Sequence, residues 1–347
     1  MTHLHILQAI AADPRDLVLC TVMRVKGSAP RHAGAKMLVG RAGRLLGSIG
    51  GGRGEALVLA ACQDALASGQ PRVLELDMQG LEVEGPVMVC GGTSRILVEP
   101  LGSPVPYRTA LELLRQGQPA LLVKGLKTGE TTLLNGTGEW AEGSMHGMDL
   151  QSARLALQSR RPVLAEAQGI LYDPLLPQEK LLILGGGHVG CALAALAPGL
   201  GFQVTVGDDR PDFLAPGRFP AEVATLGGSY TDIVAAFPFD ASTFVVIVTR
   251  GHLNDLECVR AVLPRPYLYA GFMGSQRKTR LLLDQLTKEV LEPSKVEALR
   301  APIGLEIGAE TPEELAVAIA AELIAARRES ACLEVVHGAR QARRQAP

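Results

Sequence analysis

The residues best suited to bind a ligand in this chain form two groups of glycines that lie far apart in the sequence. In the second group an apolar strand runs into a G-x-G-x-x-G loop, whose three glycine positions are Gly185, Gly187 and Gly190. In loops of this type the first glycine permits a tight turn, the second lets a pyrophosphate approach the backbone, and the third allows helix and strand to pack closely. We therefore predict a phosphate site here, with His188 either contacting the phosphate or only filling the loop.

Further residues extend this predicted phosphate site. Asp208 ends the next predicted strand, at the place where an acidic residue accepts hydrogen bonds from ribose hydroxyls. Two other loops also follow predicted strands and combine small residues with charged donors, as an anion site requires. Their candidate binding residues are Arg250, His252, Gly274 and Ser275. A nucleotide-type scaffold that binds another phosphate ligand, or none, is the alternative, because a fold does not determine a function.

The first group of glycines lies in the N-terminal hundred residues. Its triple glycine, 50–52, leaves backbone N–H groups uncovered by side chains, which suits close approach by a ligand. Cys90 stands directly before two glycines and a predicted strand, so it is either an accessible, reactive thiol that can contact a metal or an inert turn residue. By contrast, Cys20, Cys62 and Cys191 lie in an apolar strand or alanine-rich helices and are expected to fill the core. The candidate binding residues of this group are Ser28, Arg31, Gly50, Gly51, Gly52, Glu55, Cys90, Gly91 and Gly92.

Composition argues against several classes of protein. The chain has 347 residues, of which 47% are hydrophobic and 4% aromatic, enough for two or three domains with aliphatic cores. Lys plus Arg number 34 and Asp plus Glu number 36, and the resulting net charge of -2 argues against a nucleic-acid partner. No apolar run reaches the ~18 residues of a membrane span, and the N-terminus does not read as a secretory signal. The six cysteines are scattered without a C-x-x-C pair, so we expect a cytoplasmic protein with free thiols.

The order of the predicted elements indicates the fold class. Over 17–100 a buried strand, a hairpin, an alanine-rich helix at 54–68 and two more strands predict a compact α+β unit. From residue 180 onward strands and helices alternate, and the last helix begins with a capping box at Thr311 and Glu314. We therefore predict an α/β protein in which an N-terminal α+β domain precedes a Rossmann-like, doubly wound parallel sheet. The expected divisions are 1–105 for the first domain, 106–175 for an extension and linker, 176–330 for the Rossmann-like domain and 331–347 for a basic tail.

Taken in order, these motifs resemble the XdhC/CoxI family of accessory proteins for molybdenum hydroxylases such as xanthine dehydrogenase. The resemblance covers roughly residues 17–100 and 170–328. It rests on the N-terminal stretches 27–31, 50–55 and 90–92, and on the C-terminal stretches 185–190, 208–211, 249–252, 274–278 and 303–314. Two positions depart from the common family pattern: Arg53, where many relatives have cysteine or a small residue, and Gln276, where arginine is common.

The resemblance implies a role that composition and spacing do not show. Members of this family bind the molybdenum cofactor, protect it while a cysteine desulfurase installs its sulfido ligand, and deliver it to the large subunit of the hydroxylase. The expected cargo is therefore a molybdopterin in its mononucleotide or dinucleotide form, with Cys90 as the matching cysteine for its metal end. We expect a homodimer that is a cofactor chaperone more than an enzyme. An NAD(P)-dependent oxidoreductase, with His252 and Asp255 as its proton-transfer pair, and a non-catalytic nucleotide-sensing module are the alternatives.

Overall fold

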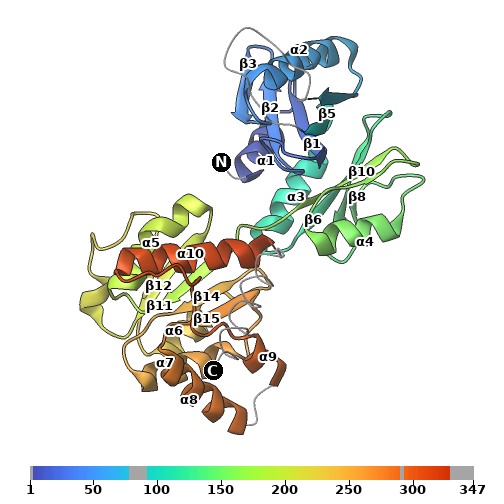
Figure 1. The fold of residues 1–347 in the computed structure, drawn as a ribbon. Helices are drawn as coiled ribbons and strands as arrows, with labels where there is room; N and C mark the ends of the chain where they lie inside the picture. Colours follow the sequence, from blue (N-terminus) through green and yellow to red (C-terminus); the bar gives the residue numbers. More distant parts are fainter. Residues whose placement is uncertain (1–2, 78–91, 290–292, 329–347) are drawn as a thin grey trace. The chain divides into compact units, whose positions relative to one another are not determined.

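The chain folds into two compact units, which are shown in Figure 1. A computed structural model describes residues 3–77, 92–289 and 293–328. The units are Met1–Pro177 and Gln178–Pro347, and each is described by itself. Within the described ranges no helix is both long enough and apolar enough to cross a membrane.

The N-terminal unit begins with an antiparallel sheet of order β3-β2-β1-β5-β4. Its strands are β1 (Val18–Lys26), β2 (Lys36–Gly40), β3 (Gly43–Gly47), β4 (Arg72–Asp77) and β5 (Thr93–Pro100). Helix α2 (Gly52–Ser68) covers one face of this sheet, because Val58, Cys62 and Ala65 share a core with Cys20 and Val98 of the strands. The hairpin, the helix and the strands expected from the sequence in this region are confirmed.

A second antiparallel sheet, of order β8-β7-β6-β10-β9, follows in the same unit. Its strands are β6 (Ala120–Gly125), β7 (Thr131–Asn135), β8 (Trp140–Glu142), β9 (Val163–Ala165) and β10 (Ile170–Leu175). Helix α4 (Leu150–Ser159) covers one face of it through Ala153 and Ala156. These elements occupy most of the segment 106–175, for which the sequence predicted an extension and a linker.

Two helices and a group of buried charges join the two sheets of this unit. Helices α1 (His3–Ala12) and α3 (Val105–Arg115) contribute to one core that also contains Leu38 of the first sheet and Leu122 of the second. The buried charges come from both sheets as well. They are Lys36 on β2, Glu99 on β5, Lys124 on β6 and Asp173 on β10, and each side chain is at most 4% exposed.

The C-terminal unit contains a five-stranded sheet of order β13-β12-β11-β14-β15, in which every pair of neighbours is parallel. Its strands are β11 (Lys180–Leu184), β12 (Gln203–Asp208), β13 (Ala224–Gly227), β14 (Phe244–Ile247) and β15 (Tyr269–Phe272). The strand order reverses between β11 and β14, and doubly wound sheets bind their ligands at such a switch point. This topology confirms the Rossmann-like fold predicted from the sequence.

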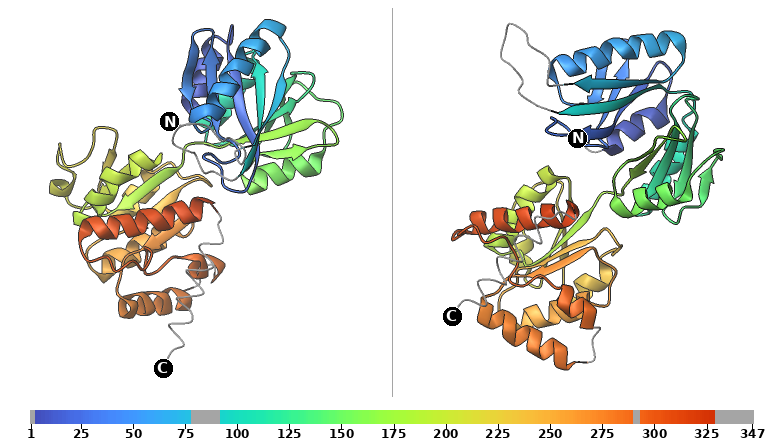
Figure 2. Two further views of the ribbon diagram at one scale, coloured as in Figure 1. Left: turned by 45° about the horizontal axis from the view of Figure 1, so that its top comes forward. Right: turned by 45° about the vertical axis from the view of Figure 1, so that its right-hand side comes forward.

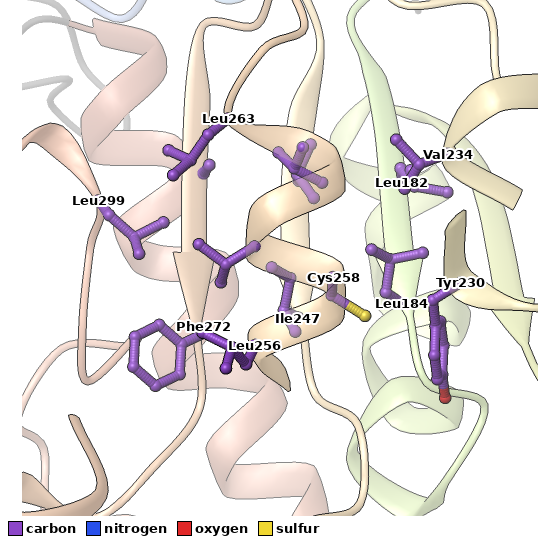
Figure 3. Close-up of a cluster of buried hydrophobic side chains, with 14 of the residues drawn as sticks. Leu182, Leu184, Tyr230, Val234, Ile247, Leu256, Cys258, Leu263, Phe272 and Leu299 are labelled. Carbon is purple, nitrogen blue, oxygen red and sulfur yellow. The ribbon is translucent and has the colours of Figure 1, made fainter. Parts of the chain in front are cut away.

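Helices cover both faces of the parallel sheet, as the views in Figure 2 show. The helical segments are α5 (His188–Leu196), η1 (Ala197–Leu200), η2 (Pro211–Leu214), α6 (Tyr230–Ala236), α7 (His252–Val262), α8 (Gln276–Lys288), α9 (Pro293–Ala298) and α10 (Pro312–Arg328). Along β11 the side chains alternate, since Ile183 joins the core under α5 and α10, whereas Leu182 and Leu184 join the core under α6 and α7. Figure 3 shows this second core, with Tyr230 of α6 beside Leu184.

Helix α10 confirms the capping box expected at its start. The backbone N–H of Glu314 donates to Thr311 Oγ1 at 3.2 Å, and Glu314 Oε2 accepts from the backbone N–H of Thr311 at 3.1 Å. These two bonds satisfy donors that the first turn of a helix otherwise leaves without partners. The helix then buries Ile319 and Leu323 against the sheet.

Candidate functional site

In the glycine loop after β11, two of the three motif glycines have no room for a side chain, and the third is uncovered. A Cβ atom on Gly185 would lie 2.6 Å from the Val248 carbonyl oxygen, and one on Gly190 would lie 1.9 Å from the Gly185 carbonyl oxygen. At Gly187, by contrast, no described atom beyond its chain neighbours lies within 4 Å of an added Cβ. Gly187 is also the N-cap of α5, whose first backbone N–H groups favour an anion, and His188 is exposed beside it. A phosphate can therefore approach the backbone at Gly187.

Asp208, at the end of β12, is fully buried, and both of its carboxylate oxygens accept hydrogen bonds from other residues of the protein. Its Oδ2 accepts from the backbone N–H of Gly186 at 2.7 Å, and its Oδ1 accepts from the backbone N–H of Arg210 at 3.0 Å. The Arg210 guanidinium adds two bonds of 2.9 Å, from Nε to Oδ1 and from Nη2 to Oδ2. Burial raises the pKa of Asp208, but the bonds from Arg210 and Gly186 outweigh it, so the pKa lies below its ordinary value. The carboxylate is therefore ionised at neutral pH and tied to the glycine loop.

The segment that follows β12 packs against the same loop. The Arg210 guanidinium lies over the Phe213 ring, with Cζ 3.4 Å from the ring centroid. Arg218 donates from Nη2 to the Gly186 carbonyl oxygen and from Nε to the Phe213 carbonyl oxygen, both at 3.1 Å. The thiol of Cys191 in turn donates to the Arg218 carbonyl oxygen at 3.2 Å. Hydrogen bonds at Arg218 thus hold the segment 210–218 against both the glycine loop and helix α5.

The loop after β14 contains a buried carboxylate that connects two helices. Thr249 Oγ1 donates to Asp255 Oδ1 at 2.5 Å, and the ammonium group of Lys278 on α8 pairs with the other oxygen of Asp255. Asp255 is fully buried in the first turn of α7. It was the expected partner of His252 in proton transfer, but its two oxygens are engaged by Thr249 and Lys278. The His252 side chain lies outside what the structure describes.

The remaining candidates of this unit lie at the same edge of the sheet. Arg250 is exposed in the turn before α7, and Ser275, which follows Gly274, caps α8 by accepting from the backbone N–H of Lys278 at 3.2 Å. Helices α5, α7 and α8 follow β11, β14 and β15, which are neighbours in the parallel sheet, so their N-termini lie at one edge. The partial positive charge of these N-termini favours an anionic ligand there.

The triple glycine of the N-terminal unit forms a loop around one carboxylate. Gly50, Gly51 and Gly52 have φ values of 143°, 78° and 61°, in the region that favours glycine. Glu55 on α2 reaches back into this loop, where its Oε2 accepts from Ser48 Oγ at 2.7 Å and from the backbone N–H of Gly51 at 3.1 Å. Successive backbone N–H groups in such turns form anion-binding hollows, and here a carboxylate of the chain itself uses one.

This contact predicts a pH-dependent contribution of Glu55 to stability. Burial raises the pKa of Glu55, but hydrogen bonds from Ser48 and Gly51 outweigh it and hold the pKa below its ordinary 4.5. The contribution is therefore fully present above pH 4.5 and is lost as the pH falls through the lower folded-state pKa. We expect Glu55→Gln to lower the free energy of unfolding by about 1–2 kcal/mol at pH 7. Urea unfolding at pH 7 and at several acidic values measures the difference between variant and wild type.

The matched control for this experiment is Glu112→Gln on the exposed surface of α3. It makes the same chemical change and is expected to alter the free energy of unfolding by less than about 0.5 kcal/mol. A Glu55→Gln effect that is constant from pH 7 down to pH 3 would contradict the assigned role of the charge.

Three of the N-terminal motifs meet in space. A Cβ atom on Gly50 would lie 2.6 Å from Pro30 Cγ, and one on Gly92 would lie 2.5 Å from the Ser28 carbonyl oxygen. The stretches 27–31, 47–55 and the start of β5 therefore form one surface, on which Ser28 and Arg31 are exposed. Gly92 is buried where the described chain resumes. Cys90 and Gly91, which the sequence singles out, lie outside the described residues.

The described cysteines fall into two classes. Cys20 and Cys62 are fully buried with their sulfur atoms 3.3 Å apart, so the expectation that they fill the core is confirmed. For Cys191 the same expectation is wrong, because this residue is only partly buried and donates its thiol proton to the Arg218 carbonyl. Cys191 lies on the side of α5 that does not face the core, whereas Leu193 and Ala194 of the same helix are buried.

Two residues of the site, Phe213 and Arg218, were not singled out from the sequence. Arg210, Thr249 and Lys278 belong to motifs that the sequence did indicate, but their contacts with Asp208 and Asp255 were not predicted. The signal available for Arg210 was its position two residues after Asp208, where a guanidinium can turn back onto the carboxylate. Among the described residues, no group of three or more His, Cys, Asp or Glu side chains is arranged to hold a metal ion.

Comparison with known proteins relates both units to one family. The family model "XdhC and CoxI family" matches residues 10–77, and the model "XdhC Rossmann domain" matches residues 181–323. A protein of Bacillus subtilis named as a probable subunit of xanthine dehydrogenase is 28% identical over 332 residues, which span 93% of this chain and 96% of that protein. The molybdenum cofactor insertion chaperone PaoD of Escherichia coli is 24% identical over 323 residues, 92% of this chain and 87% of PaoD.

A solved structure extends the likeness to the whole fold. The crystal structure described as a xanthine dehydrogenase from Bacillus halodurans is similar to this chain with a TM-score of 0.75 and 26% sequence identity. The match spans 95% of this chain and 96% of that one. The order of the two units is therefore shared with a protein of nearly the same length.

Proposed function

Because the chain belongs to the XdhC and CoxI family, we propose that it binds the molybdenum cofactor and inserts it into a molybdenum hydroxylase of the xanthine dehydrogenase type. The names of the relatives, one a molybdenum cofactor insertion chaperone and the other a probable part of xanthine dehydrogenase, support a role in maturation of a molybdenum enzyme. The structural observation that supports it most directly is the open position at Gly187. A molybdopterin ends in a phosphate, and this is the group that a helix N-terminus behind an uncovered glycine accepts.

The metal end of the cofactor is proposed to contact Cys90. Molybdenum bound through sulfur favours thiolate neighbours, and the family resemblance assigns this role to the cysteine before Gly91 and Gly92. The surface formed by Ser28, Arg31 and the triple glycine adds donors for the polar groups of a pterin. The contact at Gly187 belongs to the C-terminal unit and the contact at Cys90 to the N-terminal unit, and each is a separate proposal about its own unit with its own test.

The proposal extends to the partners of the chain. A hydroxylase large subunit is the proposed recipient, and a cysteine desulfurase is the proposed source of the sulfido ligand while the cofactor is held. We propose that the protein acts in the cytoplasm as a homodimer. Exposed glycine loops suit such a carrier, because the cargo has to leave the site again without the opening of a closed cavity.

Pterin loading tests the function and the role of Cys90 together. The purified protein is mixed with molybdenum cofactor and desalted, and the retained pterin is oxidised and measured by fluorescence. We expect about one pterin per chain for the wild type and a loss of at least about tenfold for Cys90→Ala, as for removal of a metal-contacting ligand. Cys258→Ala removes a thiol that is fully buried in the core of the C-terminal unit and is expected to retain the pterin, with thermal unfolding as the check that this variant folds.

The other outcomes are informative. Normal loading of Cys90→Ala would remove Cys90 from the proposal while leaving the chaperone function in place. Absence of pterin from the wild type, where a control carrier retains it, would contradict the function itself. Titration with NAD(P) would then decide between the oxidoreductase, which turns substrate over, and the nucleotide sensor, which binds without turnover.

A further inference from the structure

We propose that Asp208 positions the glycine loop and is not a ribose ligand, so that the loop prefers a cofactor ending in a phosphate monoester over one that continues through a ribose. This inference rests on the proposed function for the identity of the cargo. It goes beyond that function because it assigns a role to Asp208 and Arg210 and selects one form of the molybdenum cofactor.

The first argument is the hydrogen-bonding capacity of the carboxylate. An ionised carboxylate offers roughly four acceptor positions. In Asp208 two of these accept from the backbone N–H groups of Gly186 and Arg210, and two accept from the Arg210 guanidinium. The side chain is 0% exposed, so water does not complete its shell. A ribose diol would have to displace Arg210 before Asp208 could accept from it.

The second argument concerns the charge that a phosphate would meet. A free aspartate beside the loop would repel a phosphate, but the paired Arg210 guanidinium neutralises Asp208. The Arg210 side chain is 21% exposed. The Arg218 guanidinium lies nearby, with Cζ 5.2 Å from the centroid of the Phe213 ring on which Arg210 also packs. The pairing therefore removes the repulsion that an unpaired Asp208 would exert on a phosphate at the loop.

The third argument is that the segment after β12 occupies the space that a ribose would need in order to reach Asp208. The Phe213 carbonyl oxygen would lie 2.8 Å from a Cβ on Gly186, so the segment after β12 packs directly onto the loop. Arg218 fixes it there through the carbonyl oxygens of Gly186 and Phe213. In contrast, the approach to Gly187 is open and leaves all contacts of Asp208 intact. A ligand that ends at its phosphate fits without any rearrangement.

Replacement of Arg210 gives the sharpest test, because it predicts a gain of binding. Arg210→Ala leaves the Gly186 bond to Asp208 but removes both guanidinium bonds, so carboxylate oxygen becomes available to a ribose diol. We expect the affinity for ADP-ribose and for NAD+ to rise about tenfold, the effect of one or two charge-assisted hydrogen bonds. Isothermal titration with these two probes, on the full chain, measures the change. Asp209→Asn, which alters a neighbouring carboxylate 3.6 Å from Arg210, is the matched control and should show no gain.

Replacement of Asp208 separates a positioning role from a ligand role. The probes are the phosphate-monoester form of the cofactor and its cytosine dinucleotide form. The wild type is expected to retain the monoester form at least about tenfold more tightly. Asp208→Asn is expected to weaken both forms alike, because it removes the charge and one acceptor oxygen and so breaks the two-pronged ion pair with Arg210. If Asp208→Asn weakens only the ribose-containing form, or the wild type prefers that form, Asp208 is a ribose ligand and the inference is wrong.

Failure of the inference and failure of the proposed function give different results. A wild type that retains neither form contradicts the function, and the nucleotide titrations then decide the inference alone. Tight NAD+ binding that is lost in Asp208→Asn would overturn it, and a gain in Arg210→Ala would support it. Thermal unfolding checks that the variants fold; should Arg210→Ala not fold, Arg210→Lys keeps the charge, loses the two-pronged contact and is expected to gain affinity for ADP-ribose in the same direction. No gain in a folded variant overturns the inference.

Discussion

Gly190→Ala is expected to destabilise the C-terminal unit severely, whereas Gly187→Ala is expected to leave its stability almost unchanged and to weaken phosphate binding. The new methyl group at residue 190 would lie 1.9 Å from the Gly185 carbonyl oxygen, a backbone atom that cannot move without opening the loop between β11 and α5. We expect a cost of at least about 3 kcal/mol, at the upper end of overpacking effects. Urea and thermal unfolding of the two variants measure it.

Gly187→Ala provides the matched comparison, because it makes the same chemical change three residues away. No described atom beyond the chain neighbours lies within 4 Å of its Cβ, and its φ of −68° suits any residue. Stability should change by less than about 1 kcal/mol, the difference between glycine and alanine at an N-cap. The methyl group would nevertheless occupy the approach of the phosphate, so pterin retention should fall at least about tenfold. Equal pterin retention in Gly187→Ala and the wild type would show that the phosphate does not bind at this glycine.

The C-terminal unit was predictable because its local signals agree with its tertiary structure. Strand β14 is a continuous apolar run, as a strand covered by helices on both faces requires. The glycine spacing of 185–190 and the capping box of α10 are also local features whose geometry the chain fulfils. Short elements such as β13 and α6 have too few residues to show a period and were not predicted.

The second sheet of the N-terminal unit shows why the rest could not be predicted. The prolines after residue 160 suggested a linker, yet Pro174 lies inside β10. There β10 pairs with β9 only over Ile170–Tyr172, so Pro174 lies beyond that ladder and needs no N–H toward β9. Likewise, the occupation of Asp208 by Arg210 depends on a side-chain conformation, which glycine spacing does not determine. Sequence located the loops of the site but not the contacts that decide which of their groups remain available.

The second large loss of stability is expected when one of the buried charges of the N-terminal unit, Lys124, is removed. Lys124 pairs with Glu99 and lies 3.9 Å from Asp173, which in turn accepts from Lys36 at 2.8 Å. Lys124→Met would leave two buried carboxylates with one lysine. Breaking a buried pair in this way typically costs about 3–5 kcal/mol, and we expect a loss of that size. Urea unfolding at pH 7 is the measurement.

Two control variants test whether the loss of stability comes from the burial and the pairing of the charges. Arg41→Met removes the exposed pair of Arg41 with Asp16, whose side chains are 75% and 53% exposed, and is expected to cost less than about 1 kcal/mol. Lys124→Met combined with Glu99→Met removes both charges of the pair and should recover most of the loss. Burial lowers the pKa of Lys36 despite the nearby Asp173. Burial also acts to lower the pKa of Lys124, but the combined attraction of Glu99, Tyr107 and Asp173 outweighs it and raises that pKa.

The difference between the two lysines determines what the cluster contributes. Folding favours the charged form of Lys124 and disfavours that of Lys36, so Lys36→Met should cost less than Lys124→Met. Lys124 and Glu99 belong to different sheets, and Glu99 lies on the strand that begins beside Ser28 and Gly92. Loss of Lys124 should therefore loosen the joint between the sheets and weaken pterin retention at the N-terminal loops as well. Unchanged retention in a destabilised Lys124→Met would show that the first sheet keeps its loops in place without the second.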